Sequence, residues 1–180
     1  MQYVLLLRGI NVGGKNMMDM GQLKELLIRS GCRAVDTYLN SGNALLEADA
    51  PRDVLQRDLE TAMQAAFGFT VPTLLKERRE VEEIAAAVPP AWRNDAGQRT
   101  DVAYLFPAID GKETLELLPV KREYVDVLYV RGAVIWHLLR ENLNRSRLSN
   151  VVGSSLYQQM TVRNVNTARF LAAYPWKEFP

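Results

Sequence analysis

The first 76 residues alternate between strand-like and helix-like hydrophobic patterns, and this order limits the fold more than any other feature. Residues 3–7 form a continuous apolar run of strand length, which is typical of a strand covered on both faces. A helix is expected after Asp19, because Gln22 follows it at the spacing of a capping box. Gly31 is expected to end that helix.

A hairpin, a second helix and a last strand complete the pattern. Strands are expected at residues 34–39, 44–48 and 69–75, and a helix at 51–68. Pro72 favours a sheet edge for the last strand, because proline cannot donate to a strand ladder. The order βαββαβ is the ferredoxin-like split motif, and right-handed crossovers give the sheet order 4-1-3-2.

The remaining residues read as a looser second copy of the same pattern. The expected elements are a helix at 77–87, a strand at 102–106, a short helix at 113–118, a hairpin of strands 124–130 and 133–139, and helical segments at 146–158 and 164–174. We therefore predict an α+β fold of two ferredoxin-like (split βαβ) subdomains with antiparallel sheets, residues 1–76 and 77–180, plus C-terminal helices.

This topology brings two polar loops to one end of the first sheet. The first strand runs into a loop that begins at Arg8, and the second strand runs into the turn Asn40-Ser41-Gly42-Asn43. The residues expected to be neighbours are Arg8, Asn11, Lys15, Asn16, Asn40 and Asn43.

The first of these loops is one residue short of a nucleotide-binding P-loop. Residues 9–16 read G-x-x-x-x-G-K followed by Asn16, which lacks the hydroxyl that binds Mg²⁺ in such loops. The best helix cap, Asp19, comes three residues late, and a hairpin follows the helix directly. The sequence therefore disfavours a nucleotide hydrolase. Glycines that permit a tight strand-to-helix loop are an equally good explanation of the glycine pattern, but that explanation does not require Arg8 or Lys15.

A second basic segment lies near the C-terminus. Residues 140–170 carry five arginines against Glu141, a local charge of +4 in a chain whose net charge is +1. Arg163-Asn164-Val165-Asn166-Thr167 is expected to open the last helix, and helix N-termini favour anions. The alternative is that Asn164 only caps the helix and the arginines form a solvated face.

Conventional catalytic and metal sites are poorly represented. His137 is the only histidine and alternates with apolar residues, so a strand position is expected for it. The single cysteine, Cys32, follows the helix stop and reads as structural. No metal site, cofactor or catalytic residue is predicted.

Three motifs also resemble a known family. LLRGINVGGKN, TYLNSGN and TVRNVNT, in this order, resemble a widespread bacterial family described only as a domain of unknown function. The resemblance spans essentially the whole chain. It implies an α+β fold of two related subdomains, with no established activity and no catalytic residues to carry over.

The preferred function is binding of a phosphate-bearing or other anionic ligand, such as a nucleotide, RNA or a metabolite, between the subdomains. The candidate residues are Arg8, Asn11, Gly13, Gly14, Lys15, Asn16, Asn40, Ser41, Asn43, Arg163, Asn164, Asn166 and Thr167. The alternatives are an enzyme that stabilises a phosphorylated substrate electrostatically and a non-enzymatic structural or protein-interaction module. No apolar run approaches the length of a membrane span and no signal peptide is evident, so a cytoplasmic location is expected, with protein partners unknown.

Overall fold

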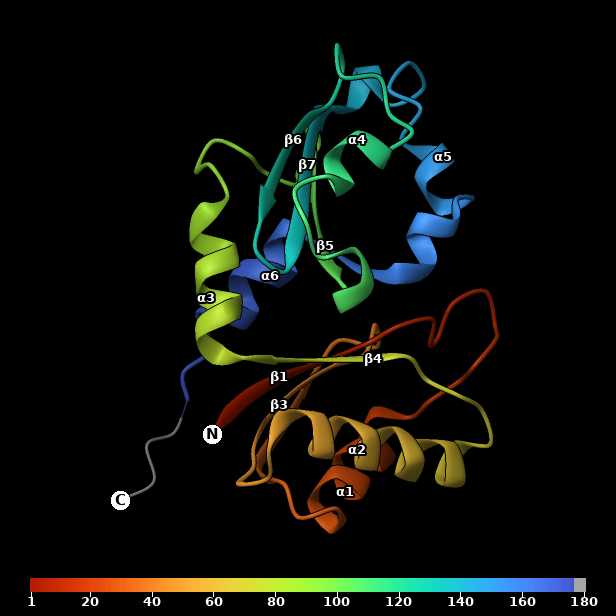
Figure 1. Ribbon diagram of the computed structural model, residues 1–180, viewed down its shortest axis with the longest axis vertical. Helices are drawn as coiled ribbons and strands as arrows, with labels where there is room; N and C mark the ends of the chain where they lie inside the picture. The colour runs from red at the N-terminus through yellow and green to blue at the C-terminus, as the bar shows by residue number, and fades with distance from the viewer. Residues whose placement is uncertain (177–180) are drawn as a thin grey trace. The chain divides into compact units, whose positions relative to one another are not determined.

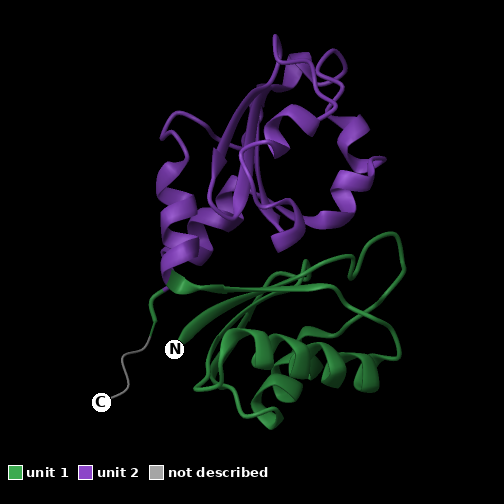
Figure 2. Cartoon of the chain, viewed as in Figure 1, with its two compact units in different colours: residues 1–78, 175–180 green, residues 79–174 purple. Residues whose placement is uncertain are grey.

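The computed structural model describes residues 1–176 and divides into two compact units (Figure 2). Unit 1 comprises Met1–Arg78 with Pro175 and Trp176, and unit 2 comprises Arg79–Tyr174. Each unit contains one four-stranded sheet in which every neighbouring pair of strands is antiparallel. None of the helices within residues 1–176 has the length and hydrophobicity that a bilayer crossing requires.

Unit 1 has the predicted ferredoxin-like topology. Its elements are β1 (Gln2–Leu7), α1 (Met20–Arg29), β2 (Arg33–Tyr38), β3 (Asn43–Glu47), α2 (Arg52–Phe67) and β4 (Thr73–Glu77). The sheet order β2-β3-β1-β4 confirms the prediction, and both helices lie on the same side of the sheet (Figure 1). Pro72 precedes β4 instead of lying inside it, so the edge position of this strand is correct but its predicted start is four residues early.

Unit 2 repeats the strand order. Its elements are α3 (Arg78–Ala87), β5 (Gln98–Leu105), α4 (Thr114–Leu117), β6 (Asp126–Val130), β7 (Ala133–Leu139), α5 (Ser149–Val152), β8 (Met160–Asn164) and α6 (Val165–Ala172), with short 3₁₀ turns between them. The order β6-β7-β5-β8 matches that of unit 1 strand for strand. The prediction of two antiparallel α+β subdomains is therefore confirmed.

The predicted helix at 146–158 is wrong. The segment contains only the four-residue α5 and a 3₁₀ turn (Ser155–Gln159), separated at Gly153. Arg147 has φ +58°, a left-handed conformation that interrupts a right-handed helix, and Ser154 caps the 3₁₀ turn by accepting from the Tyr157 amide. The strand β8 that follows was not predicted.

The core of unit 1 lies between its sheet and its two helices. Leu5 of β1, Leu23 and Leu27 of α1, and Leu59 and Met63 of α2 are fully buried in one cluster. These are the apolar positions that the helical periodicity predicts. Burying each such side chain contributes about 1.5–3 kcal/mol, so this layer fixes the positions from which the loops of unit 1 leave the sheet.

Gly42 lies in close contact with neighbouring side chains at the loop end of this sheet. Its φ is +79°, and a Cβ atom there would lie 2.8 Å from Leu7 Cβ and 2.8 Å from Ile10 Cδ1. Its carbonyl accepts from the Leu7 amide at 2.8 Å, which extends the pairing of β1 with β3. Only glycine satisfies both the backbone conformation and the close approach.

We expect Gly42→Ala to lower the free energy of unfolding by about 3 kcal/mol, because left-handed strain adds to an overpacking cost. Urea unfolding measures this loss. Gly68→Ala is the matched control, since Gly68 has φ +80° but a Cβ atom there would meet nothing within 4 Å, and this variant should lose only about 1 kcal/mol. Equal losses in the two variants would contradict the packing argument at Gly42.

Candidate functional site

The glycine-rich loop between β1 and α1 folds as a miniature hairpin. Val12 and Lys15 form an isolated antiparallel bridge, with the Lys15 amide donating to the Val12 carbonyl at 3.1 Å. Gly13 and Gly14 form the turn with φ values of +58° and +73°, the two positive values that a type I′ turn requires. A second bond of 3.1 Å, from the Asn11 amide to the Asn16 carbonyl, closes the base.

The side chain of Asn11 joins this hairpin to the β2–β3 turn. Its Oδ1 accepts from the Met18 amide at 2.8 Å, and its Nδ2 donates to the carbonyls of Met18 (3.0 Å) and Asn40 (2.9 Å). The expected meeting of the two loops is confirmed at this pair. Asn11 itself is left-handed, with φ +53°.

Two further asparagines of these loops, Asn16 and Asn43, also bind main chain of unit 1. Asn16 Nδ2 donates to the Gly9 carbonyl at 3.0 Å. Asn43 is fully buried and donates to the Tyr38 carbonyl at 2.8 Å and to Ser41 Oγ at 3.1 Å. Their amide groups therefore hold the shape of the loops.

The Lys15 side chain and the main-chain amides of Gly13 and Gly14 are the hydrogen-bond donors of this hairpin that have no acceptor among the described residues. The Lys15 side chain is exposed and forms no hydrogen bond or ion pair with any residue in 1–176. The amides of Gly13 and Gly14 likewise donate to no acceptor in the described part of the chain. Arg8, at the start of the loop, is half-buried, and its amide donates to the Pro72 carbonyl at 2.9 Å.

A hollow of about 560 Å³ begins at the base of the hairpin. Its lining residues are Asn11, Met17, Met18, Asp19, Met20, Gln22 and Asn40. The carboxylate in this lining, Asp19, caps α1 as predicted, because its Oδ1 accepts from the Gln22 amide at 2.9 Å. The sequence predicts no site role for the methionines of this lining, because nothing in their spacing separates them from core residues.

Left-handed backbone is concentrated in these two loops. Residues with positive φ in them are Gly9, Asn11, Gly13, Gly14, Asn16, Leu39 and Gly42. Leu39 is a non-glycine residue with φ +58° and a half-exposed side chain. For the non-glycine residues Asn11, Asn16 and Leu39 this conformation costs free energy, and such strain concentrates at functional sites, so this end of unit 1 is the leading candidate.

The C-terminal basic motif, residues 163–167, makes hydrogen bonds within unit 2. Arg163 in β8 is only 7% exposed, and its Nη1 donates to Thr161 Oγ1 (3.0 Å) and to the Val162 carbonyl (2.9 Å). Burial lowers the pKa of Arg163 to about 10. Asn164 caps α6, its Oδ1 accepting from the Thr167 amide at 3.0 Å, which is the capping role considered from the sequence.

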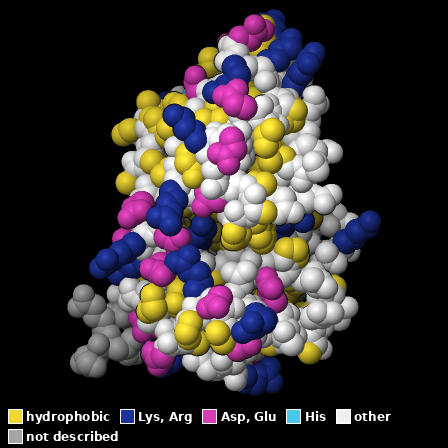
Figure 3. Space-filling model, viewed as in Figure 1, with side chains coloured by type: hydrophobic (Ala, Val, Ile, Leu, Met, Phe, Trp, Pro, Cys, Tyr) yellow, Lys and Arg dark blue, Asp and Glu magenta, His cyan; other side chains and the backbone are white. Residues whose placement is uncertain are grey.

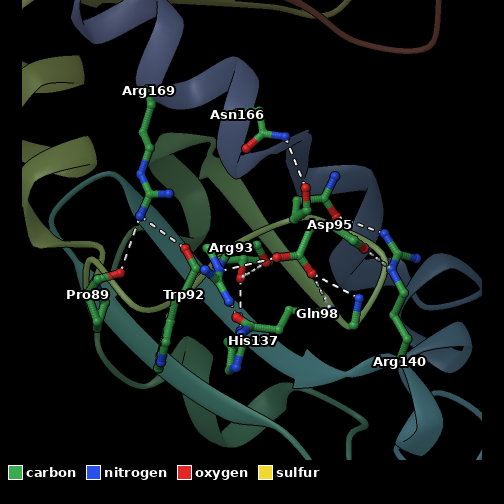
Figure 4. Close-up of polar contacts among 12 residues, drawn as sticks. Pro89, Trp92, Arg93, Asp95, Gln98, His137, Arg140, Asn166 and Arg169 are labelled. Carbon is green, nitrogen blue, oxygen red and sulfur yellow. Dashed lines mark hydrogen bonds and ion pairs between the residues drawn. The ribbon is translucent and has the colours of Figure 1, made fainter.

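Further basic and amide side chains of this region hold the loop at residues 89–98 (Figure 4). Arg169 donates to the carbonyls of Pro89 (3.2 Å) and Trp92 (3.0 Å), and Asn166 donates to the Asn94 carbonyl at 3.1 Å. Arg140 Nε donates to the Asp95 carbonyl at 2.6 Å. The proline pair at 89–90 marks a loop in the sequence, but no sequence signal pairs it with these distant side chains.

His137 occupies the predicted strand position in β7. The residue is 9% exposed, and its ring stacks on Trp92 with centroids 5.0 Å apart and an angle of 13° between the planes. Thr100 Oγ1 donates to the Arg93 carbonyl at 2.8 Å, so its contact with His137 Nδ1 (2.9 Å) requires Nδ1 to carry the hydrogen. Burial lowers the pKa of His137, and the neighbouring Asp126 partly offsets this effect.

Cys32 belongs to the core of unit 1. It is 3% exposed, and burial raises the pKa of its thiol, which favours the unreactive protonated form. Within residues 1–176, no three His, Cys, Asp or Glu side chains are grouped so that they could hold a metal ion.

Comparisons with known proteins agree with the fold. A family model described as a protein of unknown function (DUF1697) matches residues 1–136. The solved structure of the conserved bacterial protein SP0830 from Streptococcus pneumoniae is similar, with a TM-score of 0.82 and 24% sequence identity over 95% of this chain and 96% of that chain. No curated protein sequence matches the chain.

We expect Asn11→Gly to loosen the two loops of unit 1 while keeping the backbone conformation, because glycine adopts positive φ freely. The variant loses three side-chain hydrogen bonds, and the free energy of unfolding should fall by about 2 kcal/mol. Hydrogen exchange should accelerate at the Met18 amide. Asn16→Gly, which loses one bond to Gly9, is the control and should leave Met18 protected.

Acid should destabilise unit 2 through His137. Because the pKa of this ring is lower in the folded state than in the unfolded state, the unfolded chain binds more protons and stability falls as the pH drops through the ordinary histidine range, from about 7 to about 5. Melting temperatures across this range should decline more steeply for the native chain than for His137→Gln. Parallel curves for the two proteins would assign the decline to other groups.

Proposed function

The chain belongs to the DUF1697 family, and we propose that the glycine-rich loop of its unit 1 binds a small anionic ligand that bears a phosphate or carboxylate group. The open amides of Gly13 and Gly14 beside the exposed Lys15 are the single observation that carries this proposal. Arg8, at the start of the same loop, is a second basic residue of this segment.

The hairpin supplies donors without a competing acceptor. Successive main-chain amides in a glycine turn form a concave anion site, and a lysine ammonium strengthens it as a point charge. The bond from the Lys15 amide to the Val12 carbonyl and the Asn11 contacts keep this turn in one conformation. A preorganised site of this kind loses little conformational entropy when a ligand binds.

The neighbouring hollow suits the uncharged remainder of such a ligand. Methionine thioethers and neutral amides predominate in its lining, which favours a partly apolar group of metabolite or nucleoside size. The Asp19 carboxylate repels an anion at the start of α1, so the charged group of the ligand is assigned to the hairpin and not to the helix terminus.

A small ligand is favoured over RNA. Lys and Arg side chains are interspersed with Asp and Glu on the face shown in Figure 3, so that face carries no continuous basic track for a phosphate backbone. Binding is favoured over catalysis, because the loop offers cations and amides while its carboxylate, Asp19, is occupied as a helix cap. Arg163, Asn164, Asn166 and Thr167 have structural contacts inside unit 2, so the proposal rests on the loop of unit 1.

Thermal unfolding against a ligand panel tests the proposal. The panel contains inorganic phosphate, nucleotides with and without Mg²⁺, acidic metabolites and a short RNA. A ligand at one hundred times its Kd should add about 2.7 kcal/mol to the free energy of unfolding. Lys15→Gln should weaken binding about tenfold and leave the melting temperature of the free protein unchanged, because the side chain is exposed and unbonded within the described residues.

Lys112→Gln in unit 2 is the matched control, since it removes an exposed lysine of the same charge and should leave binding intact. A stabilising ligand whose affinity is the same in all three proteins would contradict the assignment to the hairpin. A panel without any stabilising anion would overturn the proposed function. Stabilisation by RNA alone would replace the small ligand with a nucleic acid.

A further inference from the structure

Unit 2 contains a second hollow, of about 530 Å³, beside its edge strand β6. Its lining residues are Pro89, Trp92, Arg122, Val125, Asp126, Val127 and Leu128. None of these residues belongs to the glycine-rich loop site of unit 1, so an inference drawn here is independent of the proposed function.

Trp92 is fixed in the wall of this hollow from both its main chain and its ring. Its amide donates to the Pro89 carbonyl at 2.9 Å, and its own carbonyl accepts from Arg169 at 3.0 Å. The indole stacks on the ring of His137, as Figure 4 shows. A ring held in this way is preorganised for a ligand, because little side-chain entropy remains to be lost.

The ring behind Trp92 is itself held in a defined state. Thr100 Oγ1 accepts a hydrogen bond from His137 Nδ1 at 2.9 Å and donates one to the Arg93 carbonyl at 2.8 Å. These contacts place a hydrogen on Nδ1, and burial of the ring, which lowers its pKa, favours the neutral imidazole over the imidazolium. A neutral ring leaves the π face of the indole electron-rich, whereas an imidazolium would already supply a cation to it.

A carboxylate lines the same hollow. Asp126 begins β6 and pairs in register with His137 of β7. Its side chain is exposed and forms no hydrogen bond or ion pair with the residues in 1–176. The cation of the lining, Arg122, already donates to the Leu115 carbonyl at 3.3 Å. The lining thus combines a fixed aromatic ring with an available negative charge.

We propose that this hollow binds an organic cation, a guanidinium or ammonium group, between the Trp92 ring and the Asp126 carboxylate. The aromatic face attracts the cation through its quadrupole, and the carboxylate accepts charge-assisted hydrogen bonds from its N–H groups. Pro89, Val127 and Leu128 supply apolar surface for the alkyl stem of the ligand. The cation belongs either to a small amine or to an arginine or lysine side chain of a peptide.

The experiment follows the indole N–H signal of Trp92 by NMR during titration with n-butylguanidinium, with n-butylurea as the uncharged analogue of the same shape. The signal is assigned as the one that disappears in Trp92→Leu. The proposal expects a saturable shift with the cation and none with the urea. Asp126→Asn should weaken binding about tenfold while the protein stays folded, because the residue is exposed.

Glu116→Gln is the matched control, since it removes another exposed carboxylate of unit 2 and should leave the affinity unchanged. A peptide with one central arginine identifies the source of the cation: tighter binding than n-butylguanidinium, with shifts along β6, indicates a protein side chain, and equal binding indicates a small amine. Equal shifts with the urea, unchanged affinity in Asp126→Asn, or no saturable shift with either cation would overturn the proposal.

Discussion

The three hydrogen bonds of the Asn11 side chain fix the end of unit 1 on which the candidate site depends. They connect the glycine-rich hairpin both to the entry of α1 at Met18 and to the β2–β3 turn at Asn40. The split βαβ topology brings the ends of β1 and β2 to the same end of the sheet, but it does not by itself fix loops of this length. Asparagine suits the position twice, because it tolerates the left-handed backbone and supplies a donor and an acceptor together.

The basic residues that stand out in the sequence have different roles in the structure. Arg163 is buried, and Arg140 and Arg169 donate to main-chain carbonyls of the loop at 89–98. These cations satisfy carbonyls that would otherwise lose their hydrogen bonds with water. Lys15 is exposed and makes no such contact in the described part of the chain. A cluster of basic residues in a sequence therefore does not show whether these residues bind a ligand or donate hydrogen bonds to the protein's own main chain.

Most of the fold could be predicted from the sequence, because apolar periodicity, caps and turn glycines agree in unit 1 and in the hairpin of unit 2. The exceptions are the segment 146–158, which is not one helix, and β8, which follows it. Thr161 and Arg163 are buried there while Val162 is only half-buried, so hydrophobicity does not alternate in the way that marks a strand. The meeting of the Asn11 and Asn40 loops follows from topology, whereas the Trp92–His137 stack depends on long-range contacts of Arg169 and Thr100 that no local pattern encodes.

The two units share one topology, but the residue that joins the equivalent loops differs, and this difference agrees with an anion site proposed in unit 1 alone. In unit 2 the loop after β5 is tied to the β6–β7 hairpin by Asp110, whose Oδ1 accepts from the Gly132 amide (2.8 Å) and from the Tyr129 hydroxyl (3.0 Å). Asp110 is thus the counterpart of Asn11, joining the equivalent loops. The two loops are joined by the neutral amide of Asn11 in unit 1 and by the carboxylate of Asp110 in unit 2. The fixed negative charge of Asp110 disfavours an anion at this end of unit 2, whereas the neutral amide of Asn11 joins the same two loops in unit 1 without adding a negative charge.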